Sequence, residues 1–202
     1  MDVLSAPPAV PLPTAADFTW LHPPPAWDGG AEAGLRFTTA PDTDFWQRTH
    51  YGFRRDNGHV WGAAVSGDAS LTARVTAEPN SQYDQLGLVA RVDAETWAKC
   101  SVEYETPAHS RLGSVVTRGG YSDWATQDVG ALPTAWYRLD VRGDDLRMSW
   151  SLDGGVWHQL RIAHLPRSGP IVLGVYGCSP TGPGFRCRAD EISLGPTDWP
   201  RG

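Results

Sequence analysis

The chain has 202 residues, a formal net charge of −6, and 22 glycines and 17 prolines. This length supports one substantial hydrophobic core, and no change of composition divides the chain, so we expect a single domain over residues 17–196. The net charge is negative and the sequence has no run of Lys or Arg. We therefore expect neither a nucleic acid nor an anionic membrane surface as a partner.

Both ends of the chain differ from the rest. Residues 1–16 read MDVLSAPPAVPLPTAA, in which prolines interrupt every apolar group. This composition predicts a disordered tail rather than a secretory signal, and we assign residues 197–202 to a short C-terminal tail. No window approaches the roughly 18 consecutive apolar residues of a membrane span, so we expect a cytoplasmic protein.

Between the tails, ten runs alternate between apolar and polar residues and are separated by turn signals. Such a succession of short strands predicts an all-β sandwich or jelly roll. Asp153-Gly154-Gly155 stands between two runs and predicts a hairpin, since glycine readily supplies the positive φ of such turns. The runs are Leu35–Thr39, Ala69–Ala77, Gln85–Val92, Trp97–Glu105, Arg111–Arg118, Trp136–Gly143, Leu146–Asp153, Val156–Ala163, Ile171–Cys178 and Phe185–Leu194.

Six short motifs in the same chain are rich in aromatic and polar residues. They are Thr43-Asp44-Phe45-Trp46, Thr49-His50-Tyr51-Gly52, Asp56-Asn57-Gly58-His59, Tyr83-Asp84-Gln85, Ser122-Asp123-Trp124 and Ser151-Leu152-Asp153-Gly154. In this order they resemble the concanavalin A-like family 1349 of the domains of unknown function, which includes a yeast regulation-of-enolase protein. The resemblance covers about Phe18 to Leu194. It implies a concanavalin A-like jelly-roll sandwich of two curved antiparallel sheets, whose concave face receives a sugar chain in lectins and glucanases.

Alternation along the central strands places polar residues together. In Trp97–Glu105 one face is apolar, while Lys99 and Glu103 project from the other. In the preceding strand, Gln85 and Arg91 also project away from the apolar face. The four side chains would form a polar floor. They are typical either of a solvated sheet face with cross-strand ion pairs or of the bottom of a binding site.

The second interpretation leads to our main hypothesis, a binding site on the concave face walled by Trp46, His50, Tyr83 and Trp124. Aromatic rings offer apolar area to a ligand, and polar side chains then fix its orientation. We expect the ligand to be a carbohydrate or a similarly sized small molecule, bound without a cofactor. The candidate ligand-binding residues are Asp44, Trp46, Tyr83, Gln85, Arg91, Lys99 and Trp124.

An alternative is a cofactor-independent enzyme on the same scaffold, either glycoside-active or an isomerase or cyclase of a specialised metabolite. In that version His50, Asp84 and Glu103 would be catalytic and would transfer protons. Glu103 and Glu105 project from the same face of one strand, about 6.5–7 Å apart at the backbone. The longer acidic motif of the glucanases of this fold is absent from the sequence. A third reading, a regulatory protein that binds another protein, follows only from the name of the yeast family member.

The histidines and cysteines have no pattern of a metal site. His50 and His59 lack the short spacing of zinc ligands, so we expect no metal. Three cysteines are an odd number, which favours buried structural thiols over a disulfide framework. Cys178 and Cys187 flank a turn, and a bridge between these two remains the open alternative.

Overall fold

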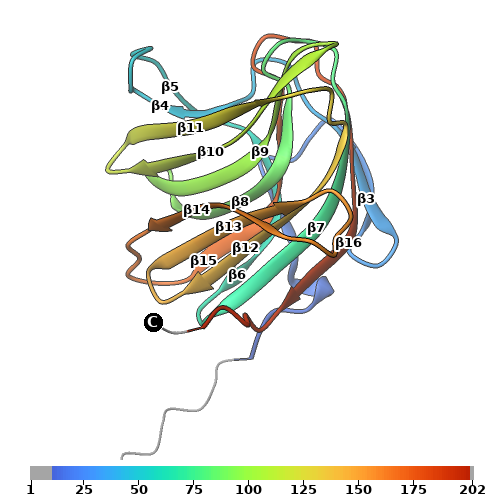
Figure 1. The fold of residues 1–202 in the computed structure, drawn as a ribbon. Helices are drawn as coiled ribbons and strands as arrows, with labels where there is room; N and C mark the ends of the chain where they lie inside the picture. Colours follow the sequence, from blue (N-terminus) through green and yellow to red (C-terminus); the bar gives the residue numbers. More distant parts are fainter. Residues whose placement is uncertain (1–10, 201–202) are drawn as a thin grey trace, which may run out of the picture.

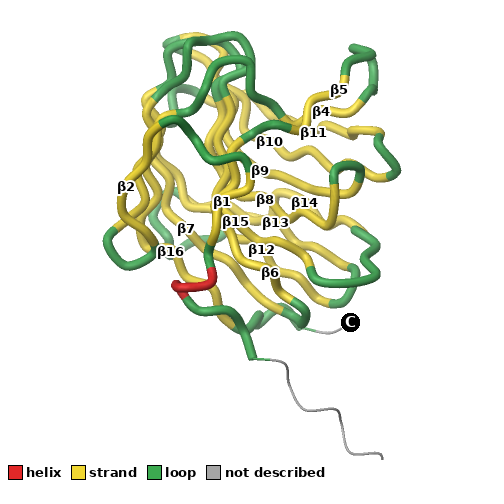
Figure 2. The backbone as a smooth tube through the Cα atoms, turned by 180° about the vertical axis from the view of Figure 1, so that it is seen from behind, coloured by secondary structure: helices red, strands yellow, loops and turns green. Residues whose placement is uncertain are grey.

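The computed structural model describes residues 11–200, and strands make up most of this part of the chain, with one short 3-10 helix (Figure 2). All ten predicted runs are strands. The elements are η1 (Ala15–Asp17), β1 (Thr19–Leu21), β2 (Ala26–Gly30), β3 (Gly34–Thr38), β4 (Phe45–Gln47), β5 (Arg54–Asp56), β6 (His59–Val65), β7 (Ala69–Glu78), β8 (Gln85–Asp93), β9 (Thr96–Thr106), β10 (His109–Arg118), β11 (Tyr121–Val129), β12 (Thr134–Arg142), β13 (Asp145–Ser151), β14 (His158–His164), β15 (Ile171–Cys178) and β16 (Arg186–Gly195).

Two curved seven-stranded sheets pack against each other (Figure 1). Sheet A has the order β1-β6-β15-β8-β9-β10-β11, and sheet B has the order β14-β13-β12-β7-β16-β3-β2. Each strand pairs antiparallel with its neighbours, including β13 with β14 across the predicted Asp153-Gly154-Gly155 hairpin. The prediction of an all-β, concanavalin A-like jelly-roll sandwich is confirmed.

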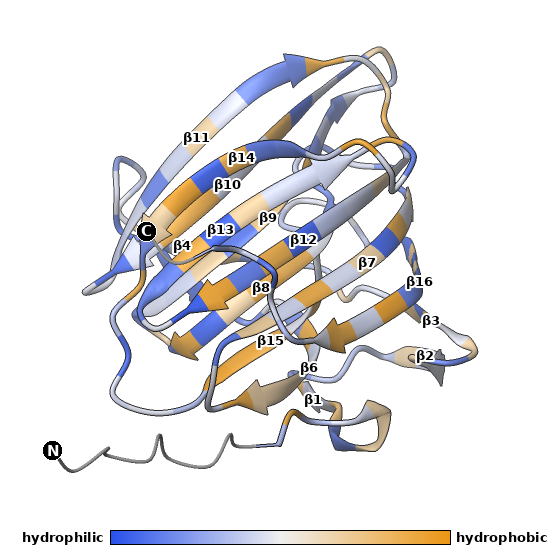
Figure 3. Cartoon of the chain, turned by 60° about the horizontal axis from the view of Figure 1, so that its bottom comes forward, coloured by the Kyte–Doolittle hydropathy of each residue, from blue (hydrophilic) through white to orange (hydrophobic). Residues whose placement is uncertain are grey.

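The main core lies between the two sheets, because one face of most strands is apolar. Hydrophilic and hydrophobic residues alternate along β7, β12 and β13 (Figure 3). Leu71, Leu139 and Met148 of sheet B pack in one buried cluster with Leu88 and Cys100 of sheet A. Burying one such aliphatic side chain contributes about 1.5–3 kcal/mol, so this cluster is the main source of stability.

A second, smaller cluster covers the opposite face of sheet A. The strands β4 and β5 form a separate two-stranded sheet, the β4–β5 hairpin, which lies beside β11 (Figure 1). Phe45 and Trp46 of this hairpin pack against Trp97, Val115 and Tyr176, which project from the outer face of sheet A. This face of an antiparallel sheet is commonly solvated. Here the hairpin buries part of it.

Parts of the two predicted tails contact the domain. Leu12 packs against the main core, whereas residues 1–10 lie outside the described residues. At the other end, the Thr197 hydroxyl donates a hydrogen bond of 2.8 Å to the buried Asp140 carboxylate. The Arg147 guanidinium, which pairs with Asp140 at 2.8 Å, also lies 5.3 Å from the Trp199 ring centroid. Thr197 and Trp199, in the predicted C-terminal tail, thus contact the Asp140–Arg147 ion pair.

Cys100, Cys178 and Cys187 are all free and buried. The possible bridge between Cys178 and Cys187 is not formed, in agreement with the expectation of structural thiols. Burial raises the pKa of all three thiols, which keeps them protonated. Within residues 11–200 no helix has the length and apolar character needed to cross a bilayer.

A buried histidine joins three segments near the start of β6. His59 Nε2 accepts a hydrogen bond of 2.9 Å from the Ala40 amide, and its Nδ1 lies 2.7 Å from the His22 carbonyl. An amide can only donate and a carbonyl can only accept, so the ring is neutral with its proton on Nδ1. Burial lowers the pKa of His59, which favours the same neutral form.

We expect stability to fall in mild acid through His59. The folded pKa lies below the ordinary value of 6.5, so the stabilisation is complete above that pH and is lost as the pH falls through the folded pKa. His59→Gln should lower the free energy of unfolding at neutral pH and flatten its decline below pH 6.5, as measured by urea unfolding. His164→Gln, at an exposed position, is the control and should keep the wild-type slope. An unchanged slope in His59→Gln would contradict the assignment.

Candidate functional site

The strand register of sheet A brings the polar floor together. Gln85 of β8 is paired with Glu103 of β9, and Glu103 is paired with Arg111 of β10. Four residues away on the same face of β9, Lys99 lies between Val89 and Val115. The predicted grouping of Gln85, Lys99 and Glu103 on one face is therefore observed. The interpretation as a solvated sheet face is wrong at Gln85 and Lys99, which are only 4% and 3% exposed.

Hydrogen bonds attach the β4–β5 hairpin to the edge of sheet A. The Gln47 amide donates to the Ser122 hydroxyl of β11 at 2.9 Å, and its side-chain amide donates to the Ala94 carbonyl at 3.1 Å. At the base of the hairpin, the Asp44 amide donates to the Asn57 side-chain oxygen at 2.9 Å. The two bonds from Gln47 hold the hairpin against the edge of sheet A, and the Asp44–Asn57 bond closes its base.

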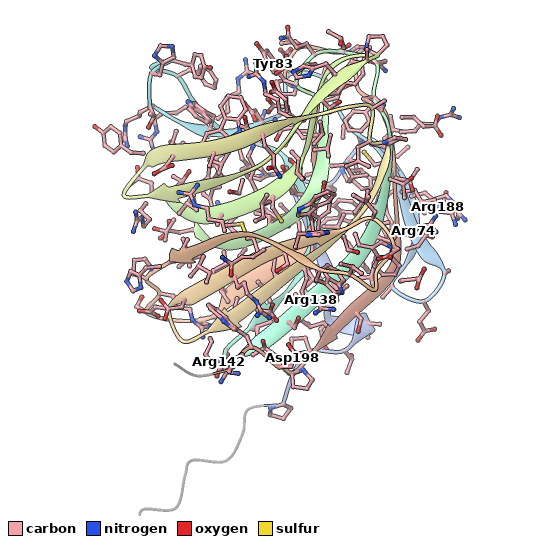
Figure 4. All side chains as sticks on the ribbon, in the orientation of Figure 1. Arg74, Tyr83, Arg138, Arg142, Arg188 and Asp198 are labelled. Carbon is pink, nitrogen blue, oxygen red and sulfur yellow. The ribbon has the colours of Figure 1, made fainter. Side chains whose placement is uncertain are left out.

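A cavity of about 470 Å³ remains between the hairpin and the polar floor, and we call it the hairpin cavity. Its walls include five aromatic side chains, among which Trp46 meets Trp124 and Tyr51 edge-to-face at 6.3 and 5.4 Å between ring centroids. Tyr83 lies at the end of the molecule that carries the hairpin, whereas Arg138 lies far from it on sheet B (Figure 4). The lining residues are Asp44, Trp46, Tyr51, Phe53, Arg55, Tyr83, Gln85, Lys99, Glu103, Val115, Trp124, Pro180 and Thr181.

One amide side chain links the two charged groups of the floor. The Lys99 ammonium donates to Gln85 Oε1 at 2.9 Å, and Gln85 Nε2 donates to Glu103 Oε2 at 2.8 Å. Lys99 also lies 3.5 Å from Asp44 Oδ1 and 5.5 Å from the Tyr176 ring centroid. A buried ammonium is unfavourable without such partners, so these contacts are what permits Lys99 to lie under the hairpin.

Glu103 is the least satisfied group of the floor. Its Oε1 is buried and accepts no hydrogen bond from the described residues. Burial raises the pKa of Glu103 to about 7, against the opposing effect of Lys99, and the charges of Asp44 and Glu105 raise it further. Near neutral pH this carboxyl group can therefore either accept or donate a proton.

Backbone strain is concentrated around the cavity. Tyr83 has a φ of 73°, and Asp42, Arg48 and His50, in the segment that forms the hairpin, have φ of 58°, 55° and 64°. The left-handed conformation is unfavourable for residues other than glycine, and residues held in it are often found at functional sites. Tyr83 is held there by its amide, which donates to the Tyr104 carbonyl at 2.7 Å. The strain thus turns the Tyr83 side chain to the cavity.

Three of the ten predicted site residues do not line this cavity. His50 is exposed and lines a neighbouring open cavity of about 430 Å³, which shares Trp46, Tyr51 and Trp124 with the hairpin cavity. Arg91 lies six residues along β8 from Gln85, about 20 Å away, and pairs with Asp56 at 2.8 Å.

Asp84 is the third residue outside the cavity, and it has a structural role. Its carboxylate accepts hydrogen bonds from the Ser179 hydroxyl at 2.6 Å and from the Asn80 and Ser81 amides at 2.9 and 3.0 Å. The preceding residue, Tyr83, lines the cavity, whereas the Asp84 carboxylate is turned toward Ser179 and the Asn80–Ser81 backbone. His50, Asp84 and Glu103 therefore do not form one proton-transfer group, which corrects that part of the enzyme hypothesis.

The sequence analysis missed several lining residues. Tyr51 and Phe53 stand within the aromatic segment that includes Trp46, so the composition of that segment was the available signal. Arg55 faces the cavity from β5, a strand of three residues that is too short to show alternation. Pro180 and Thr181 belong to a turn with no local signal at all. In residues 11–200 no group of three or more His, Cys, Asp or Glu side chains is arranged to hold a metal ion.

We expect Glu103 to make the protein less stable at high pH. Its folded pKa of about 7 lies above the ordinary 4.5, so its contribution is complete below that ordinary value and is lost as the pH rises through about 7. Glu103→Gln keeps an oxygen acceptor for Gln85 and should be more stable than the wild type at about pH 9, but not at about pH 5, in urea unfolding.

Glu78→Gln is the matched control, because Glu78 forms an exposed ion pair with Arg186 on sheet B. Its free energy of unfolding should stay within about 0.5 kcal/mol of the wild type at both pH values. A Glu103→Gln protein that is destabilised equally at both would contradict the raised pKa.

Comparison with known proteins agrees with this geometry. Residues 20–197 match the family model described as a protein of unknown function, DUF1349. The regulation of enolase protein 1 of Saccharomyces cerevisiae is 35% identical over 178 residues, which cover 87% of this chain and 88% of the yeast protein. A crystal structure of a functionally unknown protein from Saccharomyces cerevisiae superposes with a TM-score of 0.83 at 34% identity, covering 93% of this chain and 98% of that one.

More distant structures share the fold alone. The GH43 protein BlXynB of Bacillus licheniformis matches with a TM-score of 0.69 at 14% identity, over 92% of this chain and 38% of that one. An alginate lyase of Klebsiella pneumoniae matches with a TM-score of 0.53 at 11% identity, over 83% of each chain. The sandwich therefore resembles those of carbohydrate-active proteins. From its family match and its yeast relative, the chain belongs to the DUF1349 family.

Proposed function

We propose that this protein binds a carbohydrate or a similarly sized small molecule in the hairpin cavity. The observation that carries the proposal is one partly open cavity with aromatic walls and a hydrogen-bonding floor. Its volume of about 470 Å³ falls within the range of roughly 300–1,000 Å³ that is usual for small-molecule sites. Such sites combine apolar surface with a few placed polar groups, as this cavity does.

The lining suits a ligand that has both hydroxyl groups and apolar faces. The rings of Trp124 and Tyr83 offer flat surfaces to the C–H groups of a sugar or to another ring. Glu103 can accept from a hydroxyl group, and Lys99 has three N–H groups, of which Gln85 and Asp44 engage two. The carbohydrate-active proteins with the same sandwich support this ligand class only by analogy of fold.

The glycoside-active alternative has less support. It needs a second carboxylate free to act with Glu103. Glu105 is occupied, because it pairs with Arg111 at 3.2 Å and accepts from Gln82 at 2.7 Å. Asp44 lines the cavity but already accepts from the Phe45 amide at 2.7 Å and pairs with Lys99. Binding is therefore the function that these contacts support best.

We expect Trp124→Ala to weaken binding about tenfold or more, because a partly exposed ring that lines the cavity contributes through contact with the ligand. Trp46 is a poorer choice for the test, since it is 8% exposed and its loss would disturb the second cluster. Binding would be measured by isothermal titration calorimetry with the ligands selected from a glycan array and a panel of mono- and disaccharides and small aromatic alcohols.

Trp157→Ala, in the loop before β14, is the matched control, because this partly exposed ring lies under the Arg138 guanidinium of sheet B, far from the cavity (Figure 4). It should leave the affinity unchanged. Equal losses in the two variants, or no ligand from either collection, would refute the proposal.

A further inference from the structure

The floor of the hairpin cavity contains two ionisable groups that ligand binding alone does not require. A surface of hydroxyl and amide groups would suffice to orient a sugar. Instead, the protein buries a carboxyl group and an ammonium group at the two ends of one amide side chain, Gln85. Burying a charged group costs several kcal/mol of folding free energy. Packing alone therefore does not explain why the two groups lie under the hairpin.

Glu103 and Lys99 differ in how much of their hydrogen-bonding capacity the protein already uses. Glu103 has one hydrogen bond, on Oε2, while its Oε1 has no partner among the described residues. Lys99 keeps one N–H group beyond those that face Gln85 and Asp44. Both side chains line the cavity. A ligand in this space therefore meets a proton acceptor and a fixed positive charge close together.

We propose that the hairpin cavity catalyses proton transfer from carbon, with the Glu103 carboxylate as the base and the Lys99 ammonium as the stabiliser of the anion that forms. This inference rests on the proposed function, since the substrate must first bind in the same cavity. The substrate class is a carbon acid that has its acidic C–H group next to a carbonyl group, within a molecule of mono- or disaccharide size.

The reaction balances without a cofactor. The Glu103 carboxylate takes the proton, so that the C–H bond breaks and an O–H bond forms on Glu103. The electron pair moves to the carbonyl oxygen and gives an enolate, whose charge lies near Lys99. In a β,γ-unsaturated carbonyl substrate this enolate is conjugated with the C=C bond, so Glu103 can return the proton to the γ-carbon while the C=O bond re-forms and the C=C bond moves to the α,β position. The substrate is isomerised with no net oxidation or reduction. No second titratable residue is needed, in agreement with the positions of His50 and Asp84.

The protonation of Glu103 suits this role. Its pKa of about 7 makes both forms available near neutral pH, as general acid–base catalysis requires. The charged and titratable groups around it are Lys99 and Glu105 on β9, Arg111 on β10, Asp44 before β4, Arg55 on β5, Tyr83 before β8, and Tyr176 and Cys178 on β15. Among them, Lys99 and Arg111 favour the carboxylate, whereas Asp44 and Glu105 favour the protonated form.

The test uses 5-nitrobenzisoxazole, a flat carbon acid that reports on bases in apolar cavities. The base removes its C3 proton while the N–O bond breaks, the product is a coloured cyanophenolate, and the proton passes from Glu103 to water. The wild-type rate should rise with pH, with a midpoint near 7. Glu103→Gln should lose about 10²-fold or more of the rate, and Glu78→Gln on sheet B should keep it.

A second measurement keeps the test independent of the probe. The carboxyl carbon of Glu103, in protein labelled with ¹³C-glutamate, should titrate with a midpoint near 7, whereas a midpoint near 4.5 would overturn the proposal. Equal rates of the wild type and Glu103→Gln across the pH range would also overturn it. If saccharides still bind in that case, only the proton-transfer proposal fails. If no ligand binds either, the proposed function fails as well.

Discussion

The buried ammonium of Lys99 is the constraint on which the site depends. It projects from the outer face of sheet A, where solvent would normally hydrate it, and lies instead near the rings of Trp97 and Tyr176. An ammonium in such surroundings needs a counter-charge, which Asp44 supplies from the segment before β4. The position of the β4–β5 hairpin and the burial of the Lys99 charge therefore depend on each other through the Asp44–Lys99 contact. Gln85 completes the arrangement by accepting from Lys99.

The cavity exists because the hairpin covers this face only in part. Phe45 packs fully into the second cluster, whereas Trp46 and the loop residues after it leave space over Glu103. Hydrogen bonds from Gln47 to β11 and to the β8–β9 turn hold the hairpin away from closer packing. The same contacts thus stabilise the fold and keep a prepared space above charged groups. A bound ligand would cover the part of this sheet face that the hairpin leaves open.

Period-two alternation predicted the fold and the centre of the site, because it depends only on the direction of side chains along a strand. It placed Gln85, Lys99 and Glu103 on one face correctly. It failed for β6, which is buried on both faces, and for β11, a mostly exposed edge strand, since neither alternates. His50 and Asp84 lie in loops, where orientation follows from long-range hydrogen bonds and backbone strain that no local pattern contains.

The central claim, that the hairpin cavity is the ligand site, is tested most directly by nuclear magnetic resonance of the indole N–H groups. The spectrum would be followed during titration with the ligands that bind. The account predicts that the signals of Trp46 and Trp124 shift, while those of Trp136 on β12 and Trp157 before β14 stay in place. Shifts confined to Trp136 and Trp157 would contradict it.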